Sequence, residues 1–198
     1  QLGGISRNRH TYMNKDNFSD NSDYSNIIFI TGGTKSGKSE FAEHIAKKYI
    51  NLTYIALSKK RPKDEEWNQK IAIHRQRRPE NWTLIETTDL IGTLNKVTGP
   101  ILIDSIGGFV MEFLDLIDKD WLQKTNTLID LLQKRTSITL IVGEQVGWSL
   151  VSEFKIGNIY IERIGDLQKK ITKISNENWL AINGRAIKID EISLEIPS

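Results

Sequence analysis

Residues 29–45 read FITGGTKSGKSEFAEHI, and this stretch constrains the fold more than any other part of the chain. Gly32 is followed by four residues and then by Gly37, Lys38 and Ser39, which satisfies the phosphate-loop pattern G-x-x-x-x-G-K-[ST]. An apolar run precedes the loop and an amphipathic segment follows it. The sequence therefore predicts a strand, a phosphate-binding loop and a helix in direct succession.

The residue types in this loop suit a nucleoside triphosphate and magnesium. Glycines let the backbone N–H groups line an anion-sized nest, and Lys38 is placed to reach the β- and γ-phosphates. The Ser39 hydroxyl is placed to ligate Mg²⁺, and the helix that begins near Gly37 adds its positive end. The alternative is a glycine-rich turn without a ligand, which the agreement of lysine, hydroxyl and flanking elements disfavours.

The rest of the chain alternates between short apolar runs and amphipathic segments. Apolar runs at 27–31, 52–57, 82–86, 100–104 and 138–143 are separated by longer amphipathic segments, among them 39–50 and 120–135. Strands that alternate with helices predict a parallel sheet covered on both faces. We therefore expect an α/β fold of the P-loop NTPase type, a three-layer sandwich.

The C-terminal part follows a different pattern. Residues 158–174 predict a helix, and Asn183-Gly184 separates two alternating apolar segments within 179–189. Asn-Gly between such segments is a strong indication of a β-hairpin. The mostly parallel sheet is therefore expected to end in an antiparallel C-terminal hairpin edge.

Length and composition indicate one folded domain. The 198 residues are 38% hydrophobic, enough for one sizeable core. Residues 1–26 are rich in Asn, Ser and Asp and lack apolar periodicity, so they are expected to be a flexible N-terminal extension. Residues 27–198 are expected to form a single nucleotide-binding catalytic domain.

Charge and cysteine content narrow the choice of partners and compartment. The 27 basic and 25 acidic residues leave a net charge of +2, which predicts no nucleic-acid partner. The chain has no cysteine, which excludes disulfides and thiolate catalysis and fits a reducing cytosol. No apolar run approaches the roughly 20 residues of a membrane span. We expect a soluble, cytoplasmic protein.

Asp104 is the expected partner of Ser39 in magnesium binding. It ends the apolar run 100–104, where an acidic residue of a neighbouring strand supplies a second contact to the metal in phosphoryl-transfer enzymes. The alternative is that Asp104 caps a helix that begins at residues 105–107.

A phosphate loop identifies a nucleotide and leaves the reaction open. The chain has three histidines: His10 in the extension, His44 on the first expected helix, and His74 in the segment KIAIHRQRRPENW. Such a histidine is ordinarily a solvated residue of a charged helix. The neighbouring arginines are Arg75, Arg77 and Arg78. They are suited to neutralising a triphosphate while a neutral imidazole attacks phosphorus. A solvated basic face explains them equally well.

Four segments taken together resemble a known family. TGGTKSGKS, YIALS, DEEWNQKIAIHRQRRPENW and ILIDS occur in the order and at the approximate spacing found in the bifunctional adenosylcobinamide kinase and adenosylcobinamide-phosphate guanylyltransferase family of cobalamin biosynthesis. The resemblance covers residues 27–189. It implies an enzyme that phosphorylates adenosylcobinamide with ATP or GTP, then attaches GMP from GTP and releases pyrophosphate. It also implies a homotrimer.

The resemblance also implies the site residues. His74 would carry the covalent guanylyl group as the catalytic residue. Arg77 and Arg78 would offset the repulsion between the phosphates that meet in the second transfer. Together with these two arginines, the expected nucleotide contacts are Gly32, Gly33, Thr34, Lys35, Ser36, Gly37, Lys38, Ser39, Ser58, Glu86 and Asp104.

The second half departs from the family's usual pattern. Where the family has Asn-Glu-Val-Gly, a proline, an Arg-Asp pair and Leu-Asn-Gln, this chain has Glu144-Gln145-Val146-Gly147, Ser152, Ile161-Glu162 and Leu167-Gln168-Lys169. Either both transfers survive these departures, or the chain binds GTP and has lost one or both activities. A third possibility is an unrelated P-loop small-molecule kinase in which His74 is a surface residue.

Overall fold

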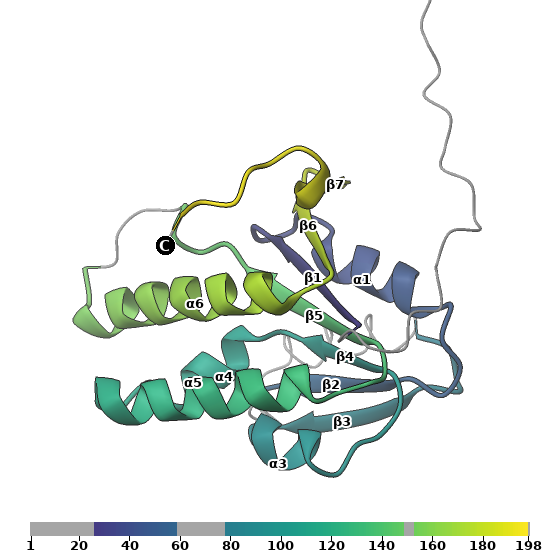
Figure 1. Cartoon of the computed structure of the whole chain (residues 1–198), viewed down its shortest axis with the longest axis horizontal. Helices are drawn as coiled ribbons and strands as arrows, with labels where there is room; N and C mark the ends of the chain where they lie inside the picture. The colour runs from purple at the N-terminus through teal and green to yellow at the C-terminus, as the bar shows by residue number, and fades with distance from the viewer. Residues whose placement is uncertain (1–25, 59–77, 149–152, 198) are drawn as a thin grey trace, which may run out of the picture.

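The computed structural model describes residues 26–58, 78–148 and 153–197, and this part of the chain contains one seven-stranded sheet (Figure 1). The strand order is β3-β2-β4-β5-β1-β6-β7. All neighbouring strands are parallel except β6 and β7, which are antiparallel. The strands are β1 Ile27–Gly32, β2 Thr53–Leu57, β3 Thr83–Thr87, β4 Ile101–Asp104, β5 Thr139–Glu144, β6 Glu177–Ile182 and β7 Arg185–Lys188.

Helices cover both faces of the sheet, as the sequence predicts. One face packs against α1, and the opposite face packs against the other four α-helices of the described chain, of which α5 and α6 lie side by side in Figure 1. Alternate residues of each strand enter the two cores, so Ile28 and Ile30 face α1 whereas Ile27 and Phe29 face α5 and α6. The helices are α1 Lys38–Ala46, α3 Leu90–Leu94, α4 Gly107–Glu112, α5 Asp118–Gln133, α6 Lys155–Ile174 and the short 3₁₀-helix η1 Ile189–Glu191.

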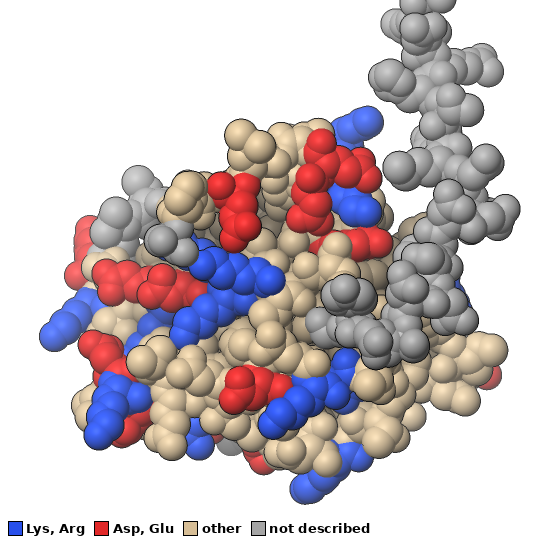
Figure 2. Space-filling model, viewed as in Figure 1, with Lys and Arg blue, Asp and Glu red and all other residues tan. Residues whose placement is uncertain are grey.

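The expected α/β three-layer fold is therefore confirmed, with small shifts at the ends of elements. The first helix ends at Ala46, whereas the amphipathic pattern continues to Ile50. The residues after Ala46 form a turn, and Asn51 then adopts a left-handed conformation with φ of 58°, which a helix cannot continue through. On the surface, basic and acidic side chains are interspersed over the face shown in Figure 2, as their nearly equal numbers suggest.

The C-terminal hairpin forms at Asn183-Gly184 as predicted, and it supports the phosphate loop. Both turn residues have positive φ, 50° and 74°, as a type I′ turn requires. The Gly184 N–H donates a hydrogen bond of 3.0 Å to the carbonyl of Ser36. A Cβ at Gly32 would collide with the carbonyl oxygen of Ala181 in β6, so this position of the loop requires glycine.

Residues 1–25 lie outside the described part of the chain, whereas Asn26 and Ile27 are hydrogen-bonded to neighbouring elements. The carbonyl of Asn26 accepts a hydrogen bond of 2.8 Å from Thr139 N–H, and the N–H of Ile27 donates one of 2.9 Å to Asn176.

Of the helices that the structure describes, none has the length and apolar character needed to cross a membrane.

Deleting residues 1–25 is expected to leave the melting temperature and GTP affinity unchanged, because the composition of this segment offers no face to bury. Calorimetry of the full and shortened chains tests this. Extending the deletion through Ile27 is the contrasting variant, because it removes the first residue of β1 and should lower the melting temperature. A large loss of stability on deleting only residues 1–25 would show that this segment docks on the domain.

Candidate active site

The phosphate loop lies between β1 and α1, the two elements that its sequence pattern requires. Gly37 and Lys35 have φ of 93° and 56°, so the backbone turns back on itself before α1 begins at Lys38. The Lys38 ammonium donates a hydrogen bond of 3.1 Å to the carbonyl of Gly33 and so bridges its own loop. The lysine is therefore held across the loop, beside the first turn of α1.

Asp104 lies at the carboxyl end of β4, on the side of the sheet that α1 covers. Leu102, two residues earlier in β4, packs in the core beneath α1. Side chains two residues apart in a strand point to the same face, so Asp104 also lies on this side. The phenolic hydroxyl of Tyr54 donates a hydrogen bond of 2.5 Å to Asp104 Oδ2. Helix α4 begins after Ile106 without a side-chain cap, so the alternative role of Asp104 as a helix cap is not observed.

Tyr54 is a site residue that sequence reasoning missed. Burial, followed by the negative charge of Asp104, raises its pKa far above the usual tyrosine range. The phenol therefore keeps its proton and remains a donor to Asp104 at any physiological pH. Alternation along β2 places Tyr54 on the correct face, but its contact with a residue 50 positions away is a tertiary feature.

Arg78 is held against Tyr54. Its guanidinium carbon lies 3.5 Å from the centroid of the Tyr54 ring, and its Nε lies 3.8 Å from Glu43 Oε1 in α1. The arginine side chain is only 11% exposed. The structure thus brings both Arg78, over the ring, and Asp104, at the hydroxyl, into contact with Tyr54, whereas His74 and Arg77 lie outside the described residues.

The two remaining residues expected to contact nucleotide lie at the same edge of the sheet. Ala56 of β2 is paired with both Glu86 of β3 and Asp104 of β4. Glu86 and Asp104 are therefore level, about 10 Å apart across two strand spacings. Glu86 is exposed, and Ser58 follows β2 directly and lines a pocket described below.

The hydroxyl of Ser39 and the carboxylate of Asp104 are oxygen donors of the kind that suit a divalent cation, although magnesium itself stays a prediction. The described residues contain no group of three or more His, Cys, Asp or Glu that could cage a metal ion. Mg²⁺ commonly binds through one or two protein ligands together with phosphate oxygens and waters. Ser39 and Asp104 would supply such a partial set, and Tyr54 would orient the carboxylate.

Replacing Tyr54 with phenylalanine is expected to weaken metal binding in the nucleotide complex by about 10–100-fold, the usual effect of removing a hydrogen-bond partner from a metal ligand. Electron paramagnetic resonance of Mn²⁺ with GTP measures this, and the Mg²⁺ concentration for half-maximal activity should rise in parallel. Tyr49→Phe, in the turn that follows α1, is the matched control. Unchanged Mn²⁺ affinity in Tyr54→Phe would show that this hydrogen bond does not orient a metal ligand.

Gln145 and Gln168, two residues that differ from the pattern expected from the resemblance, meet at Thr31, directly before the phosphate loop. Gln145 Nε2 donates a hydrogen bond of 2.9 Å to Thr31 Oγ1, and Thr31 Oγ1 donates one of 3.2 Å to Gln168 Oε1. Gln168 Nε2 in turn donates one of 3.0 Å to the carbonyl of Glu144. Thr31 is the residue before Gly32, so the two amides join α6 and β5 to the start of the loop. Ser152 lies outside the described residues.

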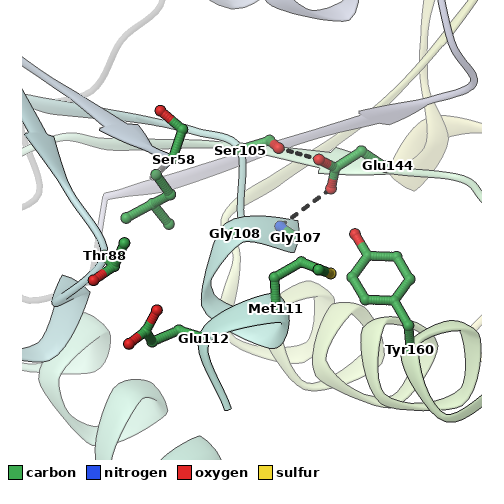
Figure 3. Close-up of a pocket in the computed structure, with 10 residues that line it drawn as sticks. Ser58, Thr88, Ser105, Gly107, Gly108, Met111, Glu112, Glu144 and Tyr160 are labelled. Atoms are coloured by element: carbon green, nitrogen blue, oxygen red, sulfur yellow. Dashed lines mark hydrogen bonds between the residues drawn. The ribbon is translucent and has the colours of Figure 1, made fainter. Parts of the chain in front are cut away.

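Glu144, the last residue of β5, is the second site residue that sequence reasoning missed. It accepts hydrogen bonds from Ser105 Oγ and, at 3.2 Å, from the N–H of Gly107 (Figure 3). Burial raises the pKa of Glu144, and the charge of Asp104 raises it further, whereas the Ser105 hydrogen bond, the charge of Lys38 and the Gly107 N–H lower it. Glu144 therefore lies within electrostatic reach of both the loop lysine and Asp104.

Comparison with known proteins gives one family for this chain. The family model described as cobinamide kinase / cobinamide phosphate guanyltransferase matches residues 28–189. The bifunctional adenosylcobalamin biosynthesis protein CobU of Escherichia coli (strain K12) is 26% identical over 181 residues, which cover 82% of this chain and 99% of that protein. The bifunctional adenosylcobalamin biosynthesis protein CobP of Pseudomonas aeruginosa is 29% identical over 150 residues, which cover 73% and 86%.

A solved structure from Pyrococcus horikoshii OT3 shares the fold with a TM-score of 0.50 and 7% sequence identity. The similarity covers 89% of this chain and 93% of that one. At this level of identity the similarity concerns the fold alone.

Proposed function

The chain belongs to the cobinamide kinase / cobinamide phosphate guanyltransferase family, and from this premise we propose that it catalyses both transfers at one nucleotide site. It phosphorylates the hydroxyl of adenosylcobinamide and then attaches GMP to the new phosphate, as a bifunctional transferase of cobalamin biosynthesis. The observation that carries this proposal is the phosphate loop between β1 and α1, in a chain that the family model matches from residue 28 to residue 189.

The kinase step uses the loop and the edge of the sheet beside it. The loop N–H groups and Lys38 would hold the β- and γ-phosphates, and Ser39 and Asp104 would hold Mg²⁺. The metal, when bound, offsets charge on the transferring phosphoryl group. Tyr54, buried and protonated, keeps Asp104 in a fixed orientation.

The guanylyltransferase step uses the same contacts between the loop and the triphosphate. Holding the β- and γ-phosphates stabilises pyrophosphate as a leaving group when a nucleophile attacks the α-phosphorus. His74 is the proposed nucleophile and Arg77 and Arg78 the proposed partners of the phosphates. Arg78 lies over the ring of Tyr54, and the Tyr54 hydroxyl donates a hydrogen bond to Asp104. The closeness of Arg78 to the proposed metal ligand supports its role as a partner of the phosphates.

The proposed substrates are adenosylcobinamide, ATP and GTP. A cytoplasmic location is proposed from the absence of cysteine, and a homotrimer from the resemblance to the family.

Incubation of the protein with adenosylcobinamide, Mg²⁺ and either ATP or GTP tests both activities separately. Mass spectrometry of the corrinoid is expected to show the phosphate ester with ATP, and the GMP derivative when GTP is then added. GTP binding without either corrinoid product would identify a member of the family that has lost both activities. Phosphate ester without GMP transfer would leave only the kinase.

A further inference from the structure

A pocket opens where the carboxyl ends of β2 and β4 meet helices α4 and α6 (Figure 3). Its volume is about 320 Å³, at the lower end of the roughly 300–1,000 Å³ of small-molecule sites. Leu57 and Met111 supply apolar wall, and Ser58 lies beside Leu57. Met111 is 57% exposed, so it stands at the mouth of the pocket.

One side of this pocket is polar, and its polar groups lie close together around Gly107. Glu144 accepts hydrogen bonds there from Ser105 and from the N–H of Gly107. A Cβ at Gly107 would collide with the Tyr160 hydroxyl and approach both carboxylate oxygens of Glu144. The hydroxyl and the carboxylate therefore come together at Gly107, and glycine leaves them the space to do so.

This polar side of the pocket adjoins the phosphate loop. Glu144 is paired in register with Gly32, the first residue of the loop, and the next residue, Gln145, donates its N–H to the Gly32 carbonyl at 3.0 Å. The charges that face Glu144 are those of Lys38 in α1 and Asp104 in β4, and the Tyr160 phenol faces it from α6. A hydroxyl that reached Glu144 would thus lie near the terminal phosphate of a nucleotide held by Lys38.

We propose that this pocket binds the hydroxyl-bearing side arm of the corrinoid, and that Glu144 is a catalytic residue that accepts the proton of that hydroxyl in the kinase step. The inference rests on the proposed function. The hydroxyl O–H bond breaks as its oxygen forms a bond to the γ-phosphorus. The bond from the γ-phosphorus to the β–γ bridging oxygen breaks, so the nucleoside diphosphate leaves and the proton resides on Glu144.

Chemistry and size favour the acceptor arm over the nucleotide as the occupant. A buried carboxylate repels anionic phosphate but accepts a hydrogen bond from a neutral alcohol. The volume of about 320 Å³ suits a side arm, so a bulky ring system would remain outside the mouth at Met111. The Tyr160 phenol offers a further polar contact at the end of the pocket.

Substitution of the carboxylate provides the first test. Glu144→Gln should lower kcat for cobinamide phosphorylation by about 10²–10⁴-fold, the usual contribution of a general base, and leave the Kd for GTP unchanged. Glu144→Asp should recover part of the lost rate. Glu162→Gln, an exposed glutamate of α6, is the matched control and should behave as the unaltered protein.

Filling the mouth of the pocket provides the second test. Met111→Trp should raise the KM for adenosylcobinamide at least tenfold without changing the Kd for GTP. Leu122→Trp introduces the same side chain at an exposed site of α5 and should change neither constant. A weaker GTP Kd with unchanged KM for the corrinoid would assign the pocket to the nucleotide and overturn the inference.

The outcomes separate this inference from the proposed function. A wild-type protein that phosphorylates adenosylcobinamide, together with a Glu144→Gln variant of equal kcat, overturns the role of Glu144 alone. A wild-type protein that binds GTP but phosphorylates no corrinoid overturns the proposed kinase activity, and the inference with it.

Discussion

Replacing Lys38 with alanine is expected to abolish measurable GTP binding and to lower kcat/KM for both transfers by about 10²–10³-fold or more. The ammonium group is the one side-chain cation of the loop that its pattern assigns to the β- and γ-phosphates. Both transfers develop negative charge on these phosphates, so a single substitution should impair both. Isothermal titration with GTP and the two corrinoid assays measure the effects.

The protein should remain folded in this variant. Within the described residues the Lys38 ammonium donates to Gly33 O, and losing this hydrogen bond costs roughly 1–2 kcal/mol against a typical domain stability of about 5–15 kcal/mol. Lys47→Ala, at the exposed end of α1, removes an equal charge outside the loop and is the matched control. If folded Lys38→Ala bound GTP as tightly as this control, the loop would not be the nucleotide site.

The second large effect is expected at His74, where substitution by asparagine should eliminate the covalent GMP adduct. A neutral imidazole is a competent nucleophile near pH 7, and the phosphoramidate it forms is reactive enough to transfer GMP to a phosphate monoester. Intact-protein mass spectrometry after incubation with GTP and Mg²⁺ should show a mass increase of one GMP in the wild type. The adduct should be labile in acid and survive mild alkali.

His44→Asn is the matched control, because His44 is an exposed histidine on α1. The control should form the adduct, whereas His74→Asn should bind GTP and form none. An adduct that persists in His74→Asn would place the guanylyl group on another residue. No adduct in the wild type would leave GMP transfer without the proposed intermediate.

Much of the fold follows from local sequence pattern. The loop G-x-x-x-x-G-K-[ST] fixed the succession of β1, loop and α1, and Asn183-Gly184 fixed the hairpin of β6 and β7. These features depend on residues close together in sequence, such as glycine where φ is positive and alternation where a strand is half-buried. The sequence also identified Asp104 as the acidic end of β4, and it supplied the resemblance on which the role of His74 depends.

Only the tertiary structure decided how the site is assembled around these motifs. Tyr54 reaches Asp104 across 50 residues, and Gln168 reaches Thr31 across 137. The pattern at residues 144–147 reads as a departure from the family, yet in the fold Glu144 meets Ser105, Gly107 and the phosphate loop. The order of the strands in the sheet determines these contacts, and burial then shifts the pKa of the groups that meet there. Neither is encoded at any single position of the chain, because both arise from the packing of distant segments.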